Sequence, residues 1–552
     1  MAGSFMGLNI AVSGLFANQR ALGVTSHNIA NANTEGYSRQ RLDMEAYRPD
    51  RLTGGMGTLG TGVDVNPVKQ IRDRFLDYKY RGEFSEYSEW ESKYEVLKNV
   101  EAILNEPSDS GMRQLMDDFY SSIQELNKNP ESLSVRTLVR ERALSLVKGI
   151  SGMSSSMKDL QSDLNFEFEV AVADLNGYAK QVSDLNKVIF ETELEGGTAN
   201  DARDQRSLLL DKMSEYADVD YFEDSQNRFH VTIGGHSLVS HYRADELVTT
   251  KRTERKNDDD VDGLVDIKWA DGSPFRPNTG KLKGILEVRD NKTGEDKGIP
   301  YYIERLNTFM DTMVAEFNRV HSQGFDLQGR SGTAFFTIND MTTTEFNTHL
   351  QSFGLDGGPA VDVTDIIETG VDPSTMTDKE VTEKIVTNIG DFLENNPQYE
   401  GKNVHYVDGR YLVVDRLKAD QITISKEMDD VNYLAASKTQ TGIPGDGDNA
   451  LALGDIRHNT NLYDWGSPDD FVKSLISNLG VDGQASKNLM DNQKLLMNNV
   501  EVSRQSIMGV SLDEEMSNMI KFQHAYSASA RMINTIDEML DIIVNRLGLV
   551  GR

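Results

Sequence analysis

Near its N-terminus the chain reads Ser26-His27-Asn28-Ile29-Ala30-Asn31-Ala32-Asn33-Thr34-Glu35-Gly36-Tyr37-Ser38-Arg39-Gln40-Arg41. A long segment without proline precedes this run, and the repeated asparagines and the glycine favour the end of a helix. Asn33 and Gly36 are suited to left-handed backbone, because glycine lacks a Cβ and asparagine tolerates that conformation. The run therefore predicts that an N-terminal helix ends here and that the chain turns.

The predicted N-terminal helix carries one narrow apolar stripe. No proline occurs from Gly3 to Ala32, and apolar residues recur every seven positions, a spacing typical of a coiled coil. The stripe consists of Leu8, Leu15, Leu22 and Ile29, and the positions between them are the small or polar Ala11, Asn18 and Thr25. A helix with so narrow a stripe depends on a packing partner for its stability.

The C-terminal end predicts a second heptad helix. Its stripe is Leu512, Met519, Tyr526, Ile533, Leu540 and Leu547, with further apolar residues at Phe522, Ile536 and Ile543. Ser511 and Glu514 have the spacing of a capping box, and at 1.5 Å per residue the helix would be ~54 Å long. A lone helix of this kind usually packs inside its own domain. Because such a helix stands at each end of the chain, we expect the two ends to pair.

The run after the first helix resembles a known signature. From Asn28 to Tyr37 it is similar to the N-I-A-N-x-N-T-x-G-Y motif of bacterial flagellar rod, hook and hook-associated proteins. The continuation resembles the family of hook-associated protein 1 (FlgK), whereas hook and rod proteins usually differ at these positions. The signature residues are Asn28, Asn31, Asn33, Gly36, Tyr37, Ser38, Arg39 and Gln40.

Three internal segments extend this resemblance. Residues 196–210 contain Asp204-Gln205-Arg206, residues 317–336 contain an F-N-x-x-H-x-x-G pattern, and residues 445–453 contain Gly447-Asp448-Asn449. Each is similar to a segment of the same family. The resemblance is strong over residues 1–215, 280–336 and 420–552, and poor over 216–280 and 337–420.

The resemblance implies a structural subunit of the flagellum that joins hook to filament as a junction ring. It also implies export through the flagellar type III apparatus without a cleaved signal, so an extracellular location is expected. The implied partners are copies of the chain, the hook protein, the second hook-associated junction protein, and a cytosolic export chaperone at the C-terminal helix. The alternatives are a hook or distal-rod protein, or an enzyme carried in an inserted domain.

We expect a multidomain α+β fold with a terminal α-helical coiled coil in which both chain ends pair, a helical-bundle body, and inserted β-rich and α/β outer domains. The expected divisions are residues 1–49 with 505–552 for the coiled coil, 50–67 for a linker, 68–215 with 296–336 and 421–504 for the body, 216–295 for the β-rich insertion and 337–420 for the α/β insertion.

Periodicity within these divisions predicts individual elements. Helices are expected at Phe75–Ile103, Met112–Leu126, Val135–Lys148, Met157–Leu194, Tyr302–Phe317 and Lys379–Leu393. Strands are expected at Phe229–Ile233, Leu238–Ser240, Leu247–Thr250, Leu264–Trp269 and Ile285–Val288, and a hairpin at Val404–Val407 and Tyr411–Val414.

Composition excludes several chemistries. The chain has no cysteine, so it has neither disulfides nor thiolate metal sites. Its formal net charge of −31 argues against a nucleic-acid partner, and no apolar stretch is long enough for a membrane span. Residues 1–42 and 511–552 carry net charges of +2 and −2, so the whole excess lies between them. We expect no catalytic residue, no cofactor and no membrane partner.

Three polar clusters could suggest a binding or catalytic site, but each is better explained as an ordinary structural feature. His230, His236 and His241 are spaced unlike ligands on one strand face, and we expect surface histidines. Asp258, Asp260 and Asp262 match the start of a calcium loop, but Trp269 stands where its glutamate should be, so we expect an acidic hairpin loop. The charged residues between Asp201 and Arg206 are expected to form a salt-linked helix face. No metal site is predicted.

Overall fold

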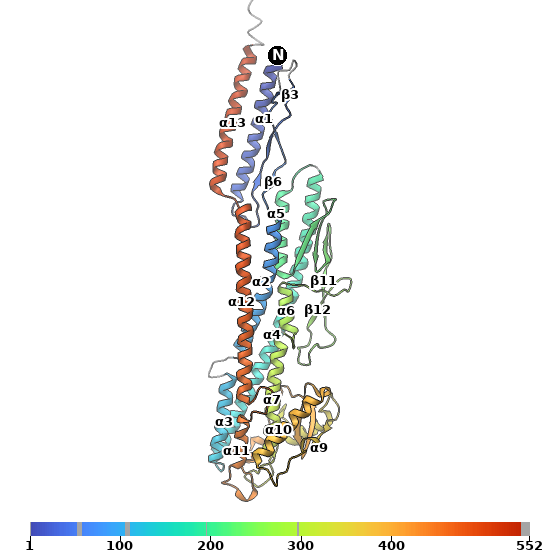
Figure 1. The fold of residues 1–552 in the computed structure, drawn as a ribbon, viewed down its shortest axis with the longest axis vertical. Helices are drawn as coiled ribbons and strands as arrows, with labels where there is room; N and C mark the ends of the chain where they lie inside the picture. Colours follow the sequence, from blue (N-terminus) through green and yellow to red (C-terminus); the bar gives the residue numbers. More distant parts are fainter. Residues whose placement is uncertain (1, 52–57, 105–110, 195, 295–296, 543–552) are drawn as a thin grey trace, which may run out of the picture.

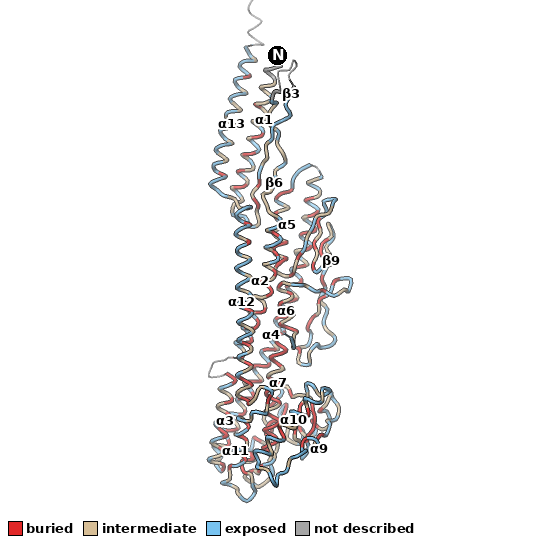
Figure 2. Tube along the Cα trace, in the orientation of Figure 1, coloured by how far each residue is buried: buried red, intermediate tan, exposed pale blue. Residues whose placement is uncertain are grey.

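The computed structural model describes residues 2–51, 58–104, 111–194, 196–294 and 297–542. The molecule is elongated (Figure 1), with the two terminal helices at one end, long helices along its middle, and a compact lobe at the other end. Burial differs between these parts (Figure 2). Residues on the inner faces of the middle and the lobe are largely buried, whereas residues of the terminal helices are mostly half-buried or exposed.

The terminal helices α1 (Ala2–Ala30) and α13 (Leu512–Asp541) lie side by side (Figure 1). On α1, small residues face α13. Cβ atoms added at Gly7 and Gly14 would lie 3.6 Å from Ile536 Cδ1 and 3.3 Å from Ser529 Oγ. Small residues let two helix backbones approach closely, so this contact differs from the leucine seam that the heptads predict. The coiled coil itself stays a prediction.

A narrow β-arm follows α1 and runs along it. Three short antiparallel pairs form it, β1 with β6, β2 with β5, and β3 with β4, and Val63 N donates to Ser13 Oγ at 3.2 Å. Its strands are β1 (Gln40–Arg41), β2 (Met44–Ala46), β3 (Asp50–Arg51), β4 (Thr58–Leu59), β5 (Val63–Val65) and β6 (Lys69–Gln70). The segment expected as a linker is therefore partly paired strand.

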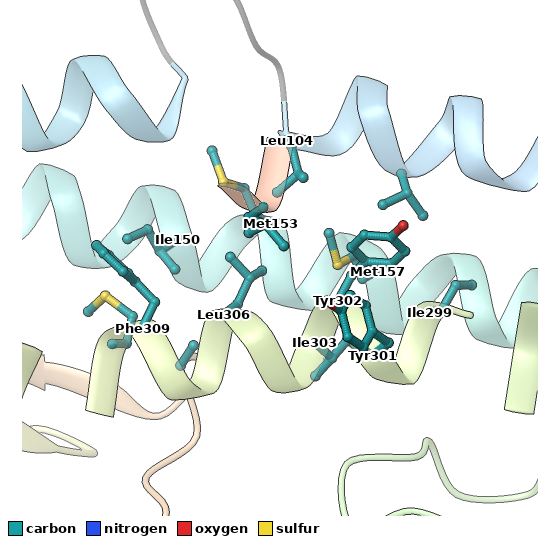
Figure 3. Packing of buried hydrophobic residues seen from close by; sticks show 14 of the residues in the cluster. Leu104, Ile150, Met153, Met157, Ile299, Tyr301, Tyr302, Ile303, Leu306 and Phe309 are labelled. Carbon is teal, nitrogen blue, oxygen red and sulfur yellow. The ribbon is translucent and has the colours of Figure 1, made fainter. Parts of the chain in front are cut away.

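Helices of the middle and of the adjoining part of the lobe share one large hydrophobic core. They are α2 (Arg74–Leu104), α3 (Met112–Lys128), α4 (Leu133–Leu194), α5 (Asn200–Tyr216), α6 (Lys281–Asp290), α7 (Ile299–Ser322), α11 (Asp448–Asp455) and α12 (Pro468–Met508). Leu306 and Phe309 of α7 point toward α4, where Ile150 and Met153 lie (Figure 3). Two separate helices were predicted within α4. That was wrong, because no proline interrupts residues 133–194 and buried residues recur through the gap.

A β-layer packs on α4. Its strands are β7 (Val219–Glu223), β8 (Phe229–Ile233), β9 (His236–Ser240), β10 (Arg243–Ala244), β11 (Leu247–Lys251) and β12 (Val265–Trp269). They form a four-stranded sheet in the order β10-β9-β8-β7 and a separate β11–β12 pair. Ile285–Val288 was predicted as a strand but lies in helix α6, because Leu282, Ile285 and Val288 have helical spacing and bury against the body.

The lobe contains the segment expected as the α/β insertion, part of which forms a separate small hydrophobic core. Its elements are β13 (Phe336–Ile338), α8 (Thr343–Phe353), β14 (Val361–Asp362), α9 (Thr364–Ile367), α10 (Asp378–Asn395), β15 (Lys402–Val407), β16 (Arg410–Asp415) and β17 (Ile422–Ile424). Short 3₁₀ turns lie at Pro397–Tyr399, Lys426–Asp429, Val431–Tyr433, Gln440–Gly442 and Ile456–His458. The predicted hairpin is present, with φ of 49° at Asp408 and 83° at Gly409.

Two of the family-like segments, 317–336 and 445–453, meet in the lobe. His321 is fully buried, with its Nδ1 2.6 Å from Thr333 O, and its Nε2 accepts from Ala435 N at 2.9 Å. Asn449 Nδ2 donates to Ala435 O at 2.7 Å. Because Nε2 accepts, the imidazole is neutral, and burial lowers the pKa of His321 to about 4.

We predict an acid-labile contribution from His321. Its pKa is about 4 when folded and ordinarily about 6.5 when unfolded. The stabilisation by neutral His321 is therefore complete above pH 6.5 and declines as the pH falls toward 4, by about 3 kcal/mol in total. Thermal unfolding of the parent chain and of His321→Gln between pH 7.5 and 4.5 checks this. Equal pH dependence in the two chains would contradict it.

Candidate assembly joint

The signature run folds back onto the end of α1 through the side chain of Asn28. This amide is almost fully buried, with 1% exposure. Its Nδ2 donates to Gln40 O at 2.8 Å and its Oδ1 accepts from Gln40 N at 3.0 Å. The Tyr37 hydroxyl also donates to Asn28 Oδ1, at 2.7 Å. One side chain thus closes the turn by satisfying both backbone groups of Gln40.

Tyr37 and Gly36 shape this turn. Burial, with nearby Asp201 and Asp204, raises the pKa of the Tyr37 hydroxyl, so it stays protonated and keeps donating. Gly36 has φ of 76°, and a Cβ at this position would lie 3.0 Å from Leu208 Cβ on α5. Both the left-handed backbone and the close approach require glycine. Asn33, predicted to be left-handed as well, is not, and its side chain is exposed.

The same run binds the start of the C-terminal helix. Arg39 Nε donates to Glu515 Oε1 at 2.8 Å, and its Nη1 donates to Glu514 Oε2 at 2.8 Å. Asn28 Nδ2 donates to Glu515 Oε2 at 3.2 Å. The predicted capping box forms only in part: Glu514 N donates to Ser511 Oγ at 3.5 Å, while the Glu514 carboxylate pairs with Arg39.

A third set of contacts joins the run to the body. Ser38 donates twice to Asp204 on α5, from its N at 3.0 Å and from its Oγ at 2.6 Å. Gln40 Nε2 donates to Asp201 Oδ1 at 2.8 Å. Asp204 was expected on a salt-linked helix face; it is buried, and its partners come from another segment rather than from its own helix. Burial raises the pKa of Asp204 despite these donors.

Buried ion pairs extend these contacts into the helical body. Arg72 Nη1 donates to Asp204 Oδ1 at 3.3 Å. One layer deeper, Asp211 on α5 accepts from Arg81 Nε of α2 and from Arg504 Nη1 of α12, both at 2.7 Å. Burial alone would raise the pKa of Asp211, but Arg81 and Arg504 hold it below its usual value. Asp211 therefore stays charged and fixes α2, α5 and α12 against one another.

We call the set of contacts around Asn28, Arg39, Asp204, Asp211 and Glu515 the joint. Some of the residues that the sequence predicted for assembly lie outside it. Asn31, just beyond the end of α1, donates from Nδ2 to His27 O at 3.1 Å. The predicted stripe residues Leu8, Leu15, Leu22 and Ile29 are half-buried beside the small-residue face. On α13 the residues Met519, Tyr526, Ile533 and Leu540 are half-buried, and Leu512 is 46% exposed. Leu547 lies outside the described residues.

The sequence analysis did not find four residues of the joint: Arg72, Asp211, Arg504 and Glu515. None of them belongs to a sequence motif, but the position of Glu515 on its helix could have identified it. It lies seven residues before Phe522, so it occupies a charged position on an apolar stripe. Such a residue is nearly always paired when buried, and Glu515 is 3% exposed.

Residues of the acidic loop that was considered as a calcium site each have a partner. Asn257 donates to Asp260 at 2.9 Å from its N, Arg255 pairs with Asp262 at 2.8 Å, and Lys418 pairs with Asp259 at 3.0 Å. Among the described residues no group of three or more histidine or acidic side chains is arranged to hold a metal. No helix in the described ranges has the length and apolarity of a bilayer span.

Comparison with known proteins begins at the two chain ends. Residues 8–37 match the family described as flagella basal body rod protein, and residues 504–547 match the C-terminal family of the flagellar basal body rod FlgEFG proteins. Both matched ranges include segments of the joint. The class of protein is therefore a structural component of the bacterial flagellum.

The whole chain identifies the family within that class. Residues 97–336 match the helical domain of flagellar hook-associated protein FlgK. Flagellar hook-associated protein 1 of Bacillus subtilis is 30% identical over 590 residues, covering 100% of both chains, and that of Escherichia coli is 26% identical, covering 98% of this chain and 99% of its own. This chain belongs to the flagellar hook-associated protein 1 (FlgK) family, as the signature predicted.

A solved structure shares the fold. The flagellar hook junction protein FlgK from Burkholderia pseudomallei superposes with a TM-score of 0.56 at 14% identity, covering 79% of this chain and 100% of that chain.

The joint makes a direct prediction about its two glutamates. Glu515→Ala removes the buried carboxylate that accepts from Arg39 Nε and from Asn28 Nδ2, while Arg39 keeps Glu514 and Asn28 keeps Gln40. Losing these charged hydrogen bonds in a buried site costs about 1.5 to 3 kcal/mol. Glu514→Ala removes an exposed pair with the same arginine and costs less than about 1 kcal/mol. Amide hydrogen exchange of α1 and α13 measures both losses. If the two variants opened these helices equally, the joint would not be the anchor that its geometry indicates.

Proposed function

We propose that this chain is the structural subunit that joins the flagellar hook to the filament, assembling as a ring of copies outside the cell after type III export. The observation that carries the proposal is the joint. There, one short run binds the end of α1, the start of α13 and the body helix α5 through Asn28, Arg39 and Ser38. Load applied to the terminal helices is thereby transmitted to the body by buried polar contacts.

The terminal helices supply the surfaces for assembly in this proposal. Since small residues of α1 face α13, the stripe from Leu8 to Ile29 remains half-exposed. On α13, Met516 is 50% exposed, Ile520 57% and Met532 55%. Exposed apolar side chains gathered on two adjacent helices are typical of a protein–protein interface. We propose that neighbouring copies, the hook protein and the second hook-associated junction protein cover them.

We further propose that a cytosolic chaperone covers α13 before export, as an amphipathic helix laid in a groove. The role is structural rather than catalytic. The division into a terminal coiled-coil domain, a helical body and two insertions is part of the same proposal. A small hydrophobic core separate from the large one supports an independent α/β insertion; it consists of Val363, Ile367, Ile385, Phe392, Val404, Tyr411 and Val413.

The function predicts a specific effect of charges on the α1 stripe. Leu15→Glu with Leu22→Glu places two carboxylates on a half-exposed surface, so the isolated chain keeps its fold while burial against neighbours becomes unfavourable. We expect at least a tenfold loss of the chain from isolated hook–filament structures, measured by immunoblot against hook protein.

The matched control is Leu138→Glu, which changes an apolar residue on α4 with 41% exposure at a site outside the terminal helices. It should enter the structures at the level of the parent chain. Normal incorporation of the double stripe variant would contradict the proposal.

A further inference from the structure

The outward face of α12 carries no charged residue along most of its length. We call it the uncharged face. It comprises the exposed residues Ser477, Val481, Gln484, Ala485, Asn488, Asn492, Leu495, Asn499, Val502, Ser503 and Ser506. At 100° per residue these positions fall within an arc of about 100°, and they extend over ~44 Å of helix. The exposed charged residues of the same segment, Lys487, Asp491 and Lys494, lie together on the neighbouring strip.

This absence of charge is unusual for this molecule. Charged residues make up 26% of the chain, and its net charge is −31. Solvent-facing sides of helices normally carry such residues. The uncharged face instead exposes Val481, Leu495 and Val502 at 64%, 62% and 69%. Depletion of charge around exposed apolar side chains is the compositional mark of an interface core.

We propose that a second copy of this chain covers the uncharged face, in addition to the contacts of the terminal helices. The partner's identity as a neighbour in the junction rests on the proposed function. Charge supplies the physical argument. Two bodies that each carry −31 repel one another, and a contact free of carboxylates lets them approach at the least electrostatic cost.

The side chains of this face suit such a partner. Asn488, Asn492 and Asn499 each carry both donors and acceptors, so they can pair with polar groups of either kind on a neighbour. Val481, Leu495 and Val502 are separated by 14 and 7 residues, so they form a narrow apolar stripe along the helix. One helix or strand of a neighbouring protein could cover a stripe of this width. Nucleic acid would require basic residues, and a lipid surface would require a broader apolar face.

The absence of cysteine from the chain provides the test. Asn492→Cys places one thiol on the uncharged face, and Lys487→Cys places one on the charged strip of the same helix as a matched control. Both sites are exposed. We expect maleimide to label the two purified variants at similar rates. In isolated hook–filament structures we expect labelling at position 492 to slow at least tenfold and labelling at 487 to change less than twofold.

A photoreactive maleimide on Asn492→Cys then identifies what covers the face. A product of two copies of this chain supports the proposal. A product with any other protein, or unslowed labelling of a chain that is present in the structures, overturns it while leaving the proposed function intact. Absence of both variants from the flagellum, with parent chain present in parallel, would contradict the proposed function and this inference together.

Discussion

The fold depends on one constraint at the joint: polar groups whose burial is unfavourable must be buried together, each with a hydrogen-bonding partner. Asn28, Glu515 and Asp204 are each less than 5% exposed, and each is acceptable there only because a partner from a different segment satisfies it. The partners of Glu515 come from the signature run and the end of α1, and those of Asp204 from the signature run and the segment between β6 and α2. Losing one segment would leave buried charges unpaired in the others, so the segments order together.

Two faces of α1 have different roles in this arrangement: one contacts α13, and the other carries the leucine stripe. Small residues such as Gly7 and Gly14 let α13 approach closely, while the leucine stripe stays half-exposed beside that contact. A helix that buried its leucines against its own partner would have little apolar surface left for other chains. The joint holds both helices in position, and their remaining apolar side chains are the surface that we propose for assembly.

Periodicity and turn chemistry were enough to predict α1, α2, α7, α13 and the hairpin at Asp408. The family followed from the run at Asn28, because turn-forming residues at fixed spacing are rare by chance. Periodicity could not show which face of α1 meets α13, since glycine and alanine carry no hydrophobic signal. It also could not find the role of Asp211, because a buried ion pair is made by residues distant in sequence. Residues 285–288 were misassigned because a short apolar run fits a strand and a helix equally well.

In this structure the two chain ends are ordered by each other and by the joint. Amide hydrogen exchange of residues 512–542 in a chain that lacks residues 1–35 tests this dependence. We expect those amides to exchange at the rate of an unfolded segment, since α13 loses both its neighbouring helix and the Asn28 contact to Glu515, while α2, α4 and α7 keep their protection. Protection of α13 at the level of the full chain would contradict the account.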